Sequence, residues 1–343
     1  MSKKKAFIIG VTGQDGSYLS KLLIKKNYLV YGYSRSINKN NLKNLIRVKI
    51  LNKIKIKKYN HENPKVILND IKKIHPNEIY YVSGQSSVGK SFFNPLETFK
   101  SNIDLPFLIL ECIRFNKLFK IKFYNSCSTD SFGQTGKIFK NEKDNFSPLS
   151  PYGNAKSFSF WLTKYYRETY GLNCKSGILS NHESPLRNKN FVLKRIIDFA
   201  RNRKKNQILK LGNISIYRDW GWAPEFVEAI YKINNAKSKK DYVVGTGKIV
   251  SLKYIVSKIF KLSKINNKFL QVNTKEYIRP NDIKKIRSDP RQIYKDLKWK
   301  SKLNIDQVIK LISKYKVESL ESGQPSLENV FMSYYQDNLK EFV

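Results

Sequence analysis

The chain has 343 residues, of which 41% are hydrophobic and 13% aromatic, enough to build the core of one large domain or two smaller ones. Its three cysteines are widely spaced and show neither a CxxC nor a Cys/His metal spacing, which argues against a disulfide scaffold or a zinc module. The formal net charge of +38 comes from basic residues scattered over the whole chain, so we do not expect nucleic acid to be a dedicated partner.

Short β-branched segments alternate with longer amphipathic segments over the first half of the chain. The predicted strands are Lys5–Val11, Leu29–Arg35, Lys53–Tyr59, Glu78–Ser83, Lys120–Ser126 and Asn173–Asn181. The predicted helices between them include Tyr18–Lys26, Leu96–Phe115 and Tyr152–Tyr170. This alternation is typical of βαβ units, and it predicts an α/β fold with a Rossmann-type, doubly wound parallel sheet and right-handed crossovers.

The pattern changes after about residue 184. A helical stretch at Val192–Lys204 is followed by loops and then by short elements at Asp241–Gly245, Ser251–Leu262 and Ile305–Tyr315. We therefore expect a dinucleotide-binding domain at 1–183, to which later segments return, and a smaller α/β substrate domain, mainly at 184–320; the tail at 321–343 receives no assignment. No apolar run reaches the roughly 18 residues of a membrane span and the start lacks a signal peptide, so we expect a cytoplasmic protein without a membrane partner.

The first motif with chemical meaning directly follows the first predicted strand. It contains Gly10, Thr12, Gly13, Gln14, Asp15 and Gly16. Glycines at these points let the backbone turn tightly and approach a pyrophosphate, whose charge is met by free N–H groups at a helix N-terminus. A purely structural turn is the alternative. Arg35 and Ser36 follow the second strand, where an NAD-selective site would have an acidic residue, so they favour a 2′-phosphate and NADP over NAD.

The second motif is Tyr152 with Lys156, whose spacing of four places both side chains on one face of a helix. A nearby ammonium and an oxidised nicotinamide would both lower the pKa of the phenol. Such a phenol can remove a hydroxyl proton while a hydride leaves for the cofactor. Because the chain has 21 tyrosines and many lysines, the pair alone could be accidental.

Both motifs together, in this order, resemble the extended short-chain dehydrogenase/reductase family. The strings GQSSV at 84–88, NHESP at 181–185 and RDWG at 218–221 are similar to those of its GDP-mannose 4,6-dehydratases, over about residues 5 to 300. The resemblance implies a nucleotide-sugar 4,6-dehydratase, a lyase that acts on GDP-mannose or a related GDP-sugar such as a GDP-heptose. Such an enzyme oxidises C4 of the hexose by hydride transfer to NADP, eliminates water across C5 and C6, and returns the hydride to C6.

The resemblance also implies the catalytic residues. Tyr152 and Lys156 would serve the C4 hydroxyl, Ser128 matches a family threonine that steadies the C4 oxygen, and Thr129 and Asp130 would carry out the elimination. The family usually has Glu at Asp130, and the missing methylene withdraws the carboxylate by roughly 1.5 Å, enough to matter for catalysis. If Asp130 only caps a loop, the alternative is a nucleotide-sugar 4-epimerase of the same fold; a non-catalytic basic phosphate or nucleic-acid binder is the distant alternative.

The binding residues are carried over in the same way, and no metal ligand is expected. Gln85 and His182 join Tyr152, Lys156 and the motif residues above at the cofactor. The substrate residues are Ser86, Asn181, Val192, Lys194, Gly212, Arg218, Arg279 and Asp282. Among these, Arg218 and Arg279 would neutralise the diphosphate, and Asp282 again replaces a family Glu. Trp220 and Trp222 are expected to pack in the core.

Assembly is the last implication. Many family members have a longer, arginine-rich loop that reaches a neighbouring subunit, whereas the segment Ile37–Asn52 is shorter and contains only Arg47 as a guanidinium. The resemblance favours a homodimer formed by Leu96–Phe115 and Tyr152–Tyr170, with a tetramer left open.

Overall fold

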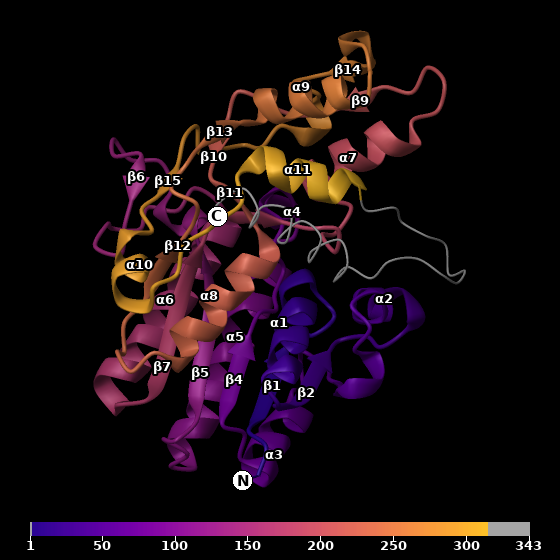
Figure 1. The fold of residues 1–343 in the computed structure, drawn as a ribbon. Helices are drawn as coiled ribbons and strands as arrows, with labels where there is room; N and C mark the ends of the chain where they lie inside the picture. The colour runs from indigo at the N-terminus through magenta and orange to yellow at the C-terminus, as the bar shows by residue number, and fades with distance from the viewer. Residues whose placement is uncertain (1, 315–343) are drawn as a thin grey trace, which may run out of the picture.

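The computed structural model describes residues 2–314, so the tail at 321–343 and the last residue of the predicted helix Ile305–Tyr315 lie outside the described residues. Its main feature is a seven-stranded parallel sheet in the order β12-β7-β5-β4-β1-β2-β3 (Figure 1). The strands are β1 (Lys5–Ile9), β2 (Leu29–Ser34), β3 (Lys55–Lys58), β4 (Glu78–Tyr81), β5 (Lys122–Ser128), β7 (Asn173–Leu179) and β12 (Tyr242–Val244). The predicted doubly wound fold is therefore confirmed.

The central strands are buried on both faces, as expected for a parallel sheet between two helical layers. In β1, Ala6 and Ile8 belong to one apolar cluster, while Phe7 and Ile9 belong to another on the opposite face. All four side chains are fully buried. The first cluster contains residues of α1 (Gln14–Lys25) and α8 (Ala223–Asn235), and the second contains residues of α3 (Lys65–Ile74), α5 (Pro95–Phe115) and α6 (Pro151–Tyr170).

Two helices differ from the predictions. Helix α1 begins at Gln14 and not at Tyr18, because its first turn lies in the glycine-rich motif, which lacks apolar periodicity. The segment expected to be a short loop, Ile37–Asn52, contains helix α2 (Lys39–Arg47), which Asn38 caps by accepting a hydrogen bond from the Asn41 amide at 3.0 Å. The short helix η1 (Leu51–Lys53) follows it.

A second layer lies beyond the carboxyl ends of the strands, at the top of Figure 1. Helices α7 (Val192–Asn202), α9 (Leu252–Leu262) and α11 (Ile305–Lys314) share an apolar cluster there. The short strand pairs are β8 (Asn181–Glu183) with β11 (Trp220–Trp222), β9 (Leu209–Lys210) with β14 (Leu270–Gln271), β10 (Tyr217–Arg218) with β13 (Val250–Ser251), and β6 (Phe139–Lys140) with β15 (Arg287–Ser288). Doubly wound folds bind ligands at this edge of the sheet.

The remaining elements are short. They are α4 (Val88–Phe93), α10 (Arg291–Leu297), η2 (Thr129–Phe132), η3 (Asn267–Phe269) and η4 (Lys275–Tyr277). None of the helices described between residues 2 and 314 is long and apolar enough to cross a membrane.

Candidate active site

The glycine-rich turn between β1 and α1 is too closely packed for side chains. Gly10 has a φ of 95°, and a Cβ atom there would lie 2.8 Å from the carbonyl oxygen of Val82. A Cβ on Gly16 would lie 2.2 Å from the carbonyl oxygen of Gly10. Gly13 is the N-cap of α1, and the first N–H groups of a helix have no partner within it. The turn therefore fits a pyrophosphate, as the sequence predicts.

Asp15 of this turn is held by His182 of β8. The Nε2 atom of His182 lies 3.0 Å from Asp15 Oδ2, and its Nδ1 atom lies 2.8 Å from the Ser180 carbonyl oxygen. Both ring nitrogens thus lie within hydrogen-bond distance of oxygen atoms. Burial alone would raise the pKa of Asp15, but the charge of His182 and its hydrogen bond outweigh burial and hold this pKa at about 2.

Gln14 strengthens the same connection between α1 and the segment after β7. Its Oε1 atom accepts a hydrogen bond from Ser184 Oγ at 2.7 Å, and its Nε2 atom donates to the His182 carbonyl oxygen at 3.2 Å. The glycine-rich motif and the NHESP string, which are far apart in sequence, are therefore connected by a network of hydrogen bonds.

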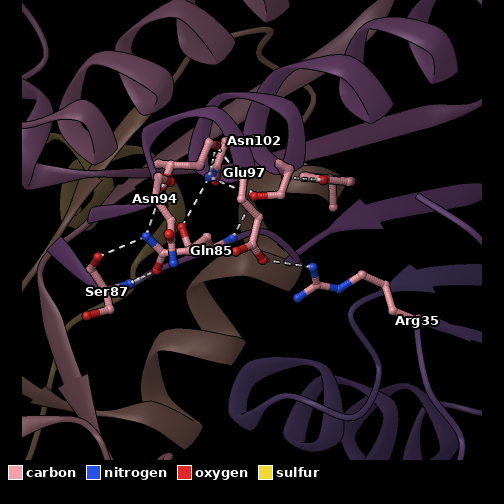
Figure 2. Close-up of polar contacts among 9 residues, drawn as sticks. Arg35, Gln85, Ser87, Asn94, Glu97 and Asn102 are labelled. Carbon is pink, nitrogen blue, oxygen red and sulfur yellow. Dashed lines mark hydrogen bonds and ion pairs between the residues drawn. The ribbon is translucent and has the colours of Figure 1, made fainter. Parts of the chain in front are cut away.

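Arg35 and Ser36 adjoin the glycine-rich turn through Ser34, the last residue of β2. Ser34 Oγ lies 3.0 Å from Thr12 Oγ1 and donates to the Ser36 carbonyl oxygen at 2.8 Å. The half-exposed Arg35 extends from this corner, and its Nη1 atom lies 3.4 Å from Glu97 Oε1 (Figure 2). Sequence analysis did not single out Glu97, since an isolated glutamate at the start of a helix carries no signal of its own.

Gln85 lies in the loop after β4, but its side chain is turned into the protein. Its Nε2 atom donates to the Ser87 carbonyl oxygen at 3.0 Å and to Thr98 Oγ1 at 3.1 Å (Figure 2). The Gln85 side chain therefore shapes the loop, while the neighbouring Ser86 is exposed.

The predicted catalytic pair, Tyr152 and Lys156, lies on the first turns of α6. Ser150 caps this helix by accepting a hydrogen bond from the Gly153 amide at 3.0 Å, which fixes the position of Tyr152. The Nζ atom of Lys156 donates to the Ser126 carbonyl oxygen at 2.8 Å and lies 6.0 Å from the centre of the Tyr152 ring. Burial lowers the pKa of Lys156 to about 8.

The pKa of Tyr152 differs from the sequence-based expectation of a lowered value. Burial raises the pKa of Tyr152, and the negative charge of Asp130 raises it further, while a hydrogen bond with Ser128 opposes both. The protein side chains alone therefore do not activate this phenol.

Asp130 follows the end of β5, in the short helix η2. Ser128 Oγ donates to Asp130 Oδ2 at 3.2 Å and accepts a hydrogen bond from the Asp130 amide at 3.2 Å, so Ser128 and not Asp130 caps the turn. The half-buried Asp130 borders a small pocket that Leu149 and Ser150 also line. Thr129, by contrast, is only 3% exposed.

Three of the predicted substrate residues meet beside this pocket. Arg218 Nη2 donates to Asp282 Oδ1 at 2.7 Å, and Arg279 Nη1 donates to the same oxygen at 3.1 Å. Burial lowers the pKa of Arg218, while the carboxylates of Asp282 and Asp130 raise it. The structure thus brings the proposed diphosphate arginines close to the proposed C5 base.

The NHESP and RDWG strings pair as parallel strands, β8 and β11, with Asn181 opposite Trp220 and His182 opposite Gly221. Asp219, between Arg218 and Trp220, accepts hydrogen bonds from the amides of Thr246 and Gly247, both at 2.9 Å. Trp220 and Trp222 are 3% and 2% exposed, so their expected packing role is confirmed.

The other predicted substrate residues lie in the second layer. Val192 begins α7, and Lys194 forms an ion pair with Asp198 one turn later. Gly212 packs against the backbone of Tyr277, where a Cβ atom would lie 2.3 Å from the carbonyl oxygen. Within the described part of the chain, these residues form no hydrogen bond or ion pair with Ser128, Asp130, Tyr152 or Lys156.

Arg187 is a site residue that sequence analysis missed. Its guanidinium lies 3.6 Å from the ring centre of Phe191, and its positive charge contributes to the lowered pKa of Asp15. The only feature of the sequence that could have indicated Arg187 is its position two residues after the NHESP string. Among residues 2–314, no group of three or more His, Cys, Asp or Glu side chains is placed to hold a metal ion.

The chain is similar in sequence to known proteins of one family. The family model described as GDP-mannose 4,6 dehydratase matches residues 7–312. A GDP-mannose 4,6 dehydratase of Dictyostelium discoideum is 32% identical, with 94% of this chain and 98% of the relative covered. One of Sinorhizobium fredii is 34% identical, with 76% of each chain covered.

Solved structures share the fold. A UDP-glucose 4-epimerase of Thermotoga maritima has a TM-score of 0.79 and 19% identity, with 91% of this chain and 98% of the other covered. A dTDP-glucose 4,6-dehydratase of Bacillus anthracis, in complex with NAD, has a TM-score of 0.79 and 17% identity, with 91% and 96% covered.

Proposed function

Because this chain belongs to the GDP-mannose 4,6-dehydratase family, a family of hydro-lyases, we propose that it converts GDP-mannose, or a closely related GDP-sugar, to the GDP-4-keto-6-deoxy sugar and water. The observation that carries the proposal is the convergence of Ser128, Asp130 and Tyr152 from three elements, β5, η2 and α6, with the Ser128 hydroxyl bonded to the Asp130 carboxylate at 3.2 Å. An enzyme that only oxidises and reduces C4 needs no such carboxylate.

Each side chain of this group has a separate task. Tyr152 removes the proton of the C4 hydroxyl, and the Ser128 hydroxyl exchanges its bond to Asp130 for a hydrogen bond to the C4 oxygen. Once C4 is a ketone, the C5 proton is acidic enough for the Asp130 carboxylate to remove it. Thr129 would relay the proton that Asp130 has taken from C5 to the departing C6 oxygen, which leaves as water, and the proton held by Tyr152 would go to C5 when the hydride reaches C6. Lys156 supplies a positive charge that favours the phenolate.

The nicotinamide cofactor, when bound, accepts the hydride from C4 and returns it to C6. The close-packed turn at Gly10 and Gly16 and the first turn of α1 fit its pyrophosphate. We propose NADP over NAD because Arg35 and Ser36 follow β2 where the adenosine ribose binds in this fold, and a guanidinium suits a 2′-phosphate.

Two buried or half-buried guanidinium groups support the diphosphate assignment. Arg218 is 5% exposed and shares Asp282 with Arg279, so both are held in place before substrate arrives. Bidentate donors of this kind suit phosphate oxygens.

We further propose a homodimer formed by α5 and α6. These helices pack side by side, yet they leave large apolar side chains half-exposed: Phe107 at 41%, Phe158 at 54%, Trp161 at 50% and Tyr165 at 49%. Apolar surface of this kind on adjacent helices is typical of a protein interface.

The test is incubation with a panel of nucleotide sugars, followed by mass spectrometry. Loss of one water from GDP-mannose supports the dehydratase, whereas an isomer of unchanged mass supports the 4-epimerase alternative. No conversion of any donor contradicts both.

Two variants then assign the steps. Asp130→Asn should lower product formation by about 100-fold or more, the usual cost of losing a general base, while reduced nicotinamide still becomes visible on addition of GDP-mannose. Tyr152→Phe should block both product formation and this absorbance change. The matched control is Asp104→Asn, an exposed aspartate of α5. If Asp130→Asn retains full dehydration, the C5 base is wrongly assigned.

A further inference from the structure

The acidic side chain of Glu97 lies beside Arg35, where we expect the 2′-phosphate of NADP to bind. Glu97 belongs to α5, which is not part of the motif that contains Arg35 and Ser36. Arg35 follows β2, and Glu97 lies in the first turn of α5, 62 positions later in the chain. Their side chains point toward one another across the end of the sheet, with 3.4 Å between Arg35 Nη1 and Glu97 Oε1 (Figure 2).

The first turn of α5 that carries Glu97 is held rigidly. Thr98, the next residue, is fully buried, donates to the Asn94 carbonyl oxygen at 2.8 Å and accepts a hydrogen bond from Gln85 Nε2 at 3.1 Å. One turn on, Asn102 Nδ2 donates to the Gln85 carbonyl oxygen at 3.1 Å. The loop after β4 and the start of α5 therefore form one unit, which presents Glu97 beside Arg35 (Figure 2).

The Arg35–Glu97 ion pair itself is weak. The two side chains are 50% and 54% exposed, and exposed pairs add little to stability because water and salt screen them. The contribution of this pair to the stability of the fold is therefore small.

We infer that Glu97 sets the selectivity between NADP and NAD by competing with the 2′-phosphate for Arg35. A phosphomonoester carries about −1.5 to −2 charges at neutral pH. To bind Arg35 it must displace the Glu97 carboxylate and then remain close to it, so Glu97 opposes NADP binding. NAD lacks this phosphate, so the Glu97 carboxylate does not repel it. The enzyme should then discriminate less strongly between the two cofactors than Arg35 alone predicts.

This inference rests on the proposed nicotinamide site, but its test needs no turnover. The dissociation constants of NADP and NAD are measured by titration calorimetry, without sugar nucleotide, for the wild type and for Glu97→Gln. The substitution keeps the shape of the side chain and removes its charge. We expect NADP to bind about five-fold more tightly, as repulsion between exposed charges a few ångströms apart implies, and NAD affinity to stay unchanged.

Two comparisons show that the effect acts at this corner. In an Arg35→Gln background, Glu97→Gln should improve NADP binding less, because there is no guanidinium to release. The matched control Glu168→Gln removes one negative charge from an exposed glutamate of α6, whose side chain is 60% exposed, and should leave both constants unchanged. The five-fold gain should also shrink at high salt.

Three results would overturn the inference: unchanged NADP affinity in Glu97→Gln, an equal change for both cofactors, or weaker NAD binding, which would mean that Glu97 accepts a hydrogen bond from the ribose. Failure of the proposed function is seen separately. If the wild type binds NAD more tightly than NADP, the NADP assignment fails whatever Glu97→Gln does, and if it binds neither, the cofactor site is wrong.

Discussion

At the scale of single residues, the buried amine of Lys156 determines how activity should depend on pH. Lys156 is 5% exposed, and its Nζ atom donates to one carbonyl oxygen, that of Ser126. Burial disfavours the ammonium form, which is why the pKa falls from 10.5 to about 8. Below pH 8 the amine is charged and supports the Tyr152 phenolate; above it, this support is lost.

We therefore expect kcat/KM to fall on the alkaline side, with a midpoint near the Lys156 pKa of about 8. The measurement is a profile of kcat/KM over about pH 6 to 10. Lys156→Arg, whose guanidinium stays charged, should retain reduced activity and lose this alkaline decline. If kcat/KM of Lys156→Arg falls at the same pH, the decline is caused by the titration of a group other than Lys156.

At the scale of elements, the contact between α6 and η2 fixes the distance between the two proposed bases. A Cβ atom on Gly153 would lie 2.8 Å from the carbonyl oxygen of Asp130 and 3.0 Å from Pro148 Cβ. Since the first neighbour is backbone, it cannot rotate away. Gly153 thus allows α6 and η2 to pack closely, as they must if Tyr152 and Asp130 act on one hexose ring as proposed.

Gly153→Ala should push α6 and η2 apart by several tenths of an ångström and lower kcat/KM by about 100-fold, since catalysis is sensitive to such displacements. The control is Gly136→Ala, because a Cβ atom there meets nothing within 4 Å. Steady-state kinetics with circular dichroism separate lost geometry from lost folding. Equal activity of both variants would contradict this account.

The elements differ in how well sequence predicted them. Strands β1, β2, β4 and β5 end within two residues of their predicted ends, because apolar runs between turns leave little freedom. Helix α8 was not among the predicted elements, although it packs on α1. It begins at Ala223, directly after the buried Trp222, with no capping side chain to mark its start.

The site was predictable where residues lie in one motif and not where they meet through the fold. The glycine-rich turn and the Tyr152–Lys156 pair each lie within a few positions. By contrast, Glu97 reaches Arg35 from a different strand-to-helix unit, and the resemblance could not supply this contact. The raised pKa of Tyr152 likewise depends on burial and on Asp130, which spacing within a helix does not reveal.

At the scale of the whole molecule, the half-exposed aromatic side chains of α5 and α6 predict the assembly. Trp161 of α6 is 50% exposed, although its ring contacts Phe146 and Phe160 along one edge. In the proposed dimer, the exposed part of this ring would be covered by the second copy.

Trp161→Glu should then weaken the dimer by about 100-fold or more, because a carboxylate buried without a partner costs about 3–5 kcal/mol. Light scattering after gel filtration measures the mass directly. Ile208→Glu is the matched control, since Ile208 is 48% exposed in the loop before β9. A wild type that is already monomeric, or a Trp161→Glu variant with unchanged mass, would refute the proposed interface.

The carboxylate of Asp282 accepts hydrogen bonds from both Arg218 and Arg279, and this limits which anions the two arginines can bind. Asp282 already neutralises part of the charge of the two arginines, so at the proposed diphosphate site an incoming anion would have to displace a carboxylate that belongs to the chain. A single phosphate would compete poorly with the Asp282 carboxylate, whereas two linked phosphates could bind both arginines at once. In this proposal, selectivity for two linked phosphates would come from the Asp282 carboxylate, in a chain whose net charge of +38 would otherwise attract anions of every kind.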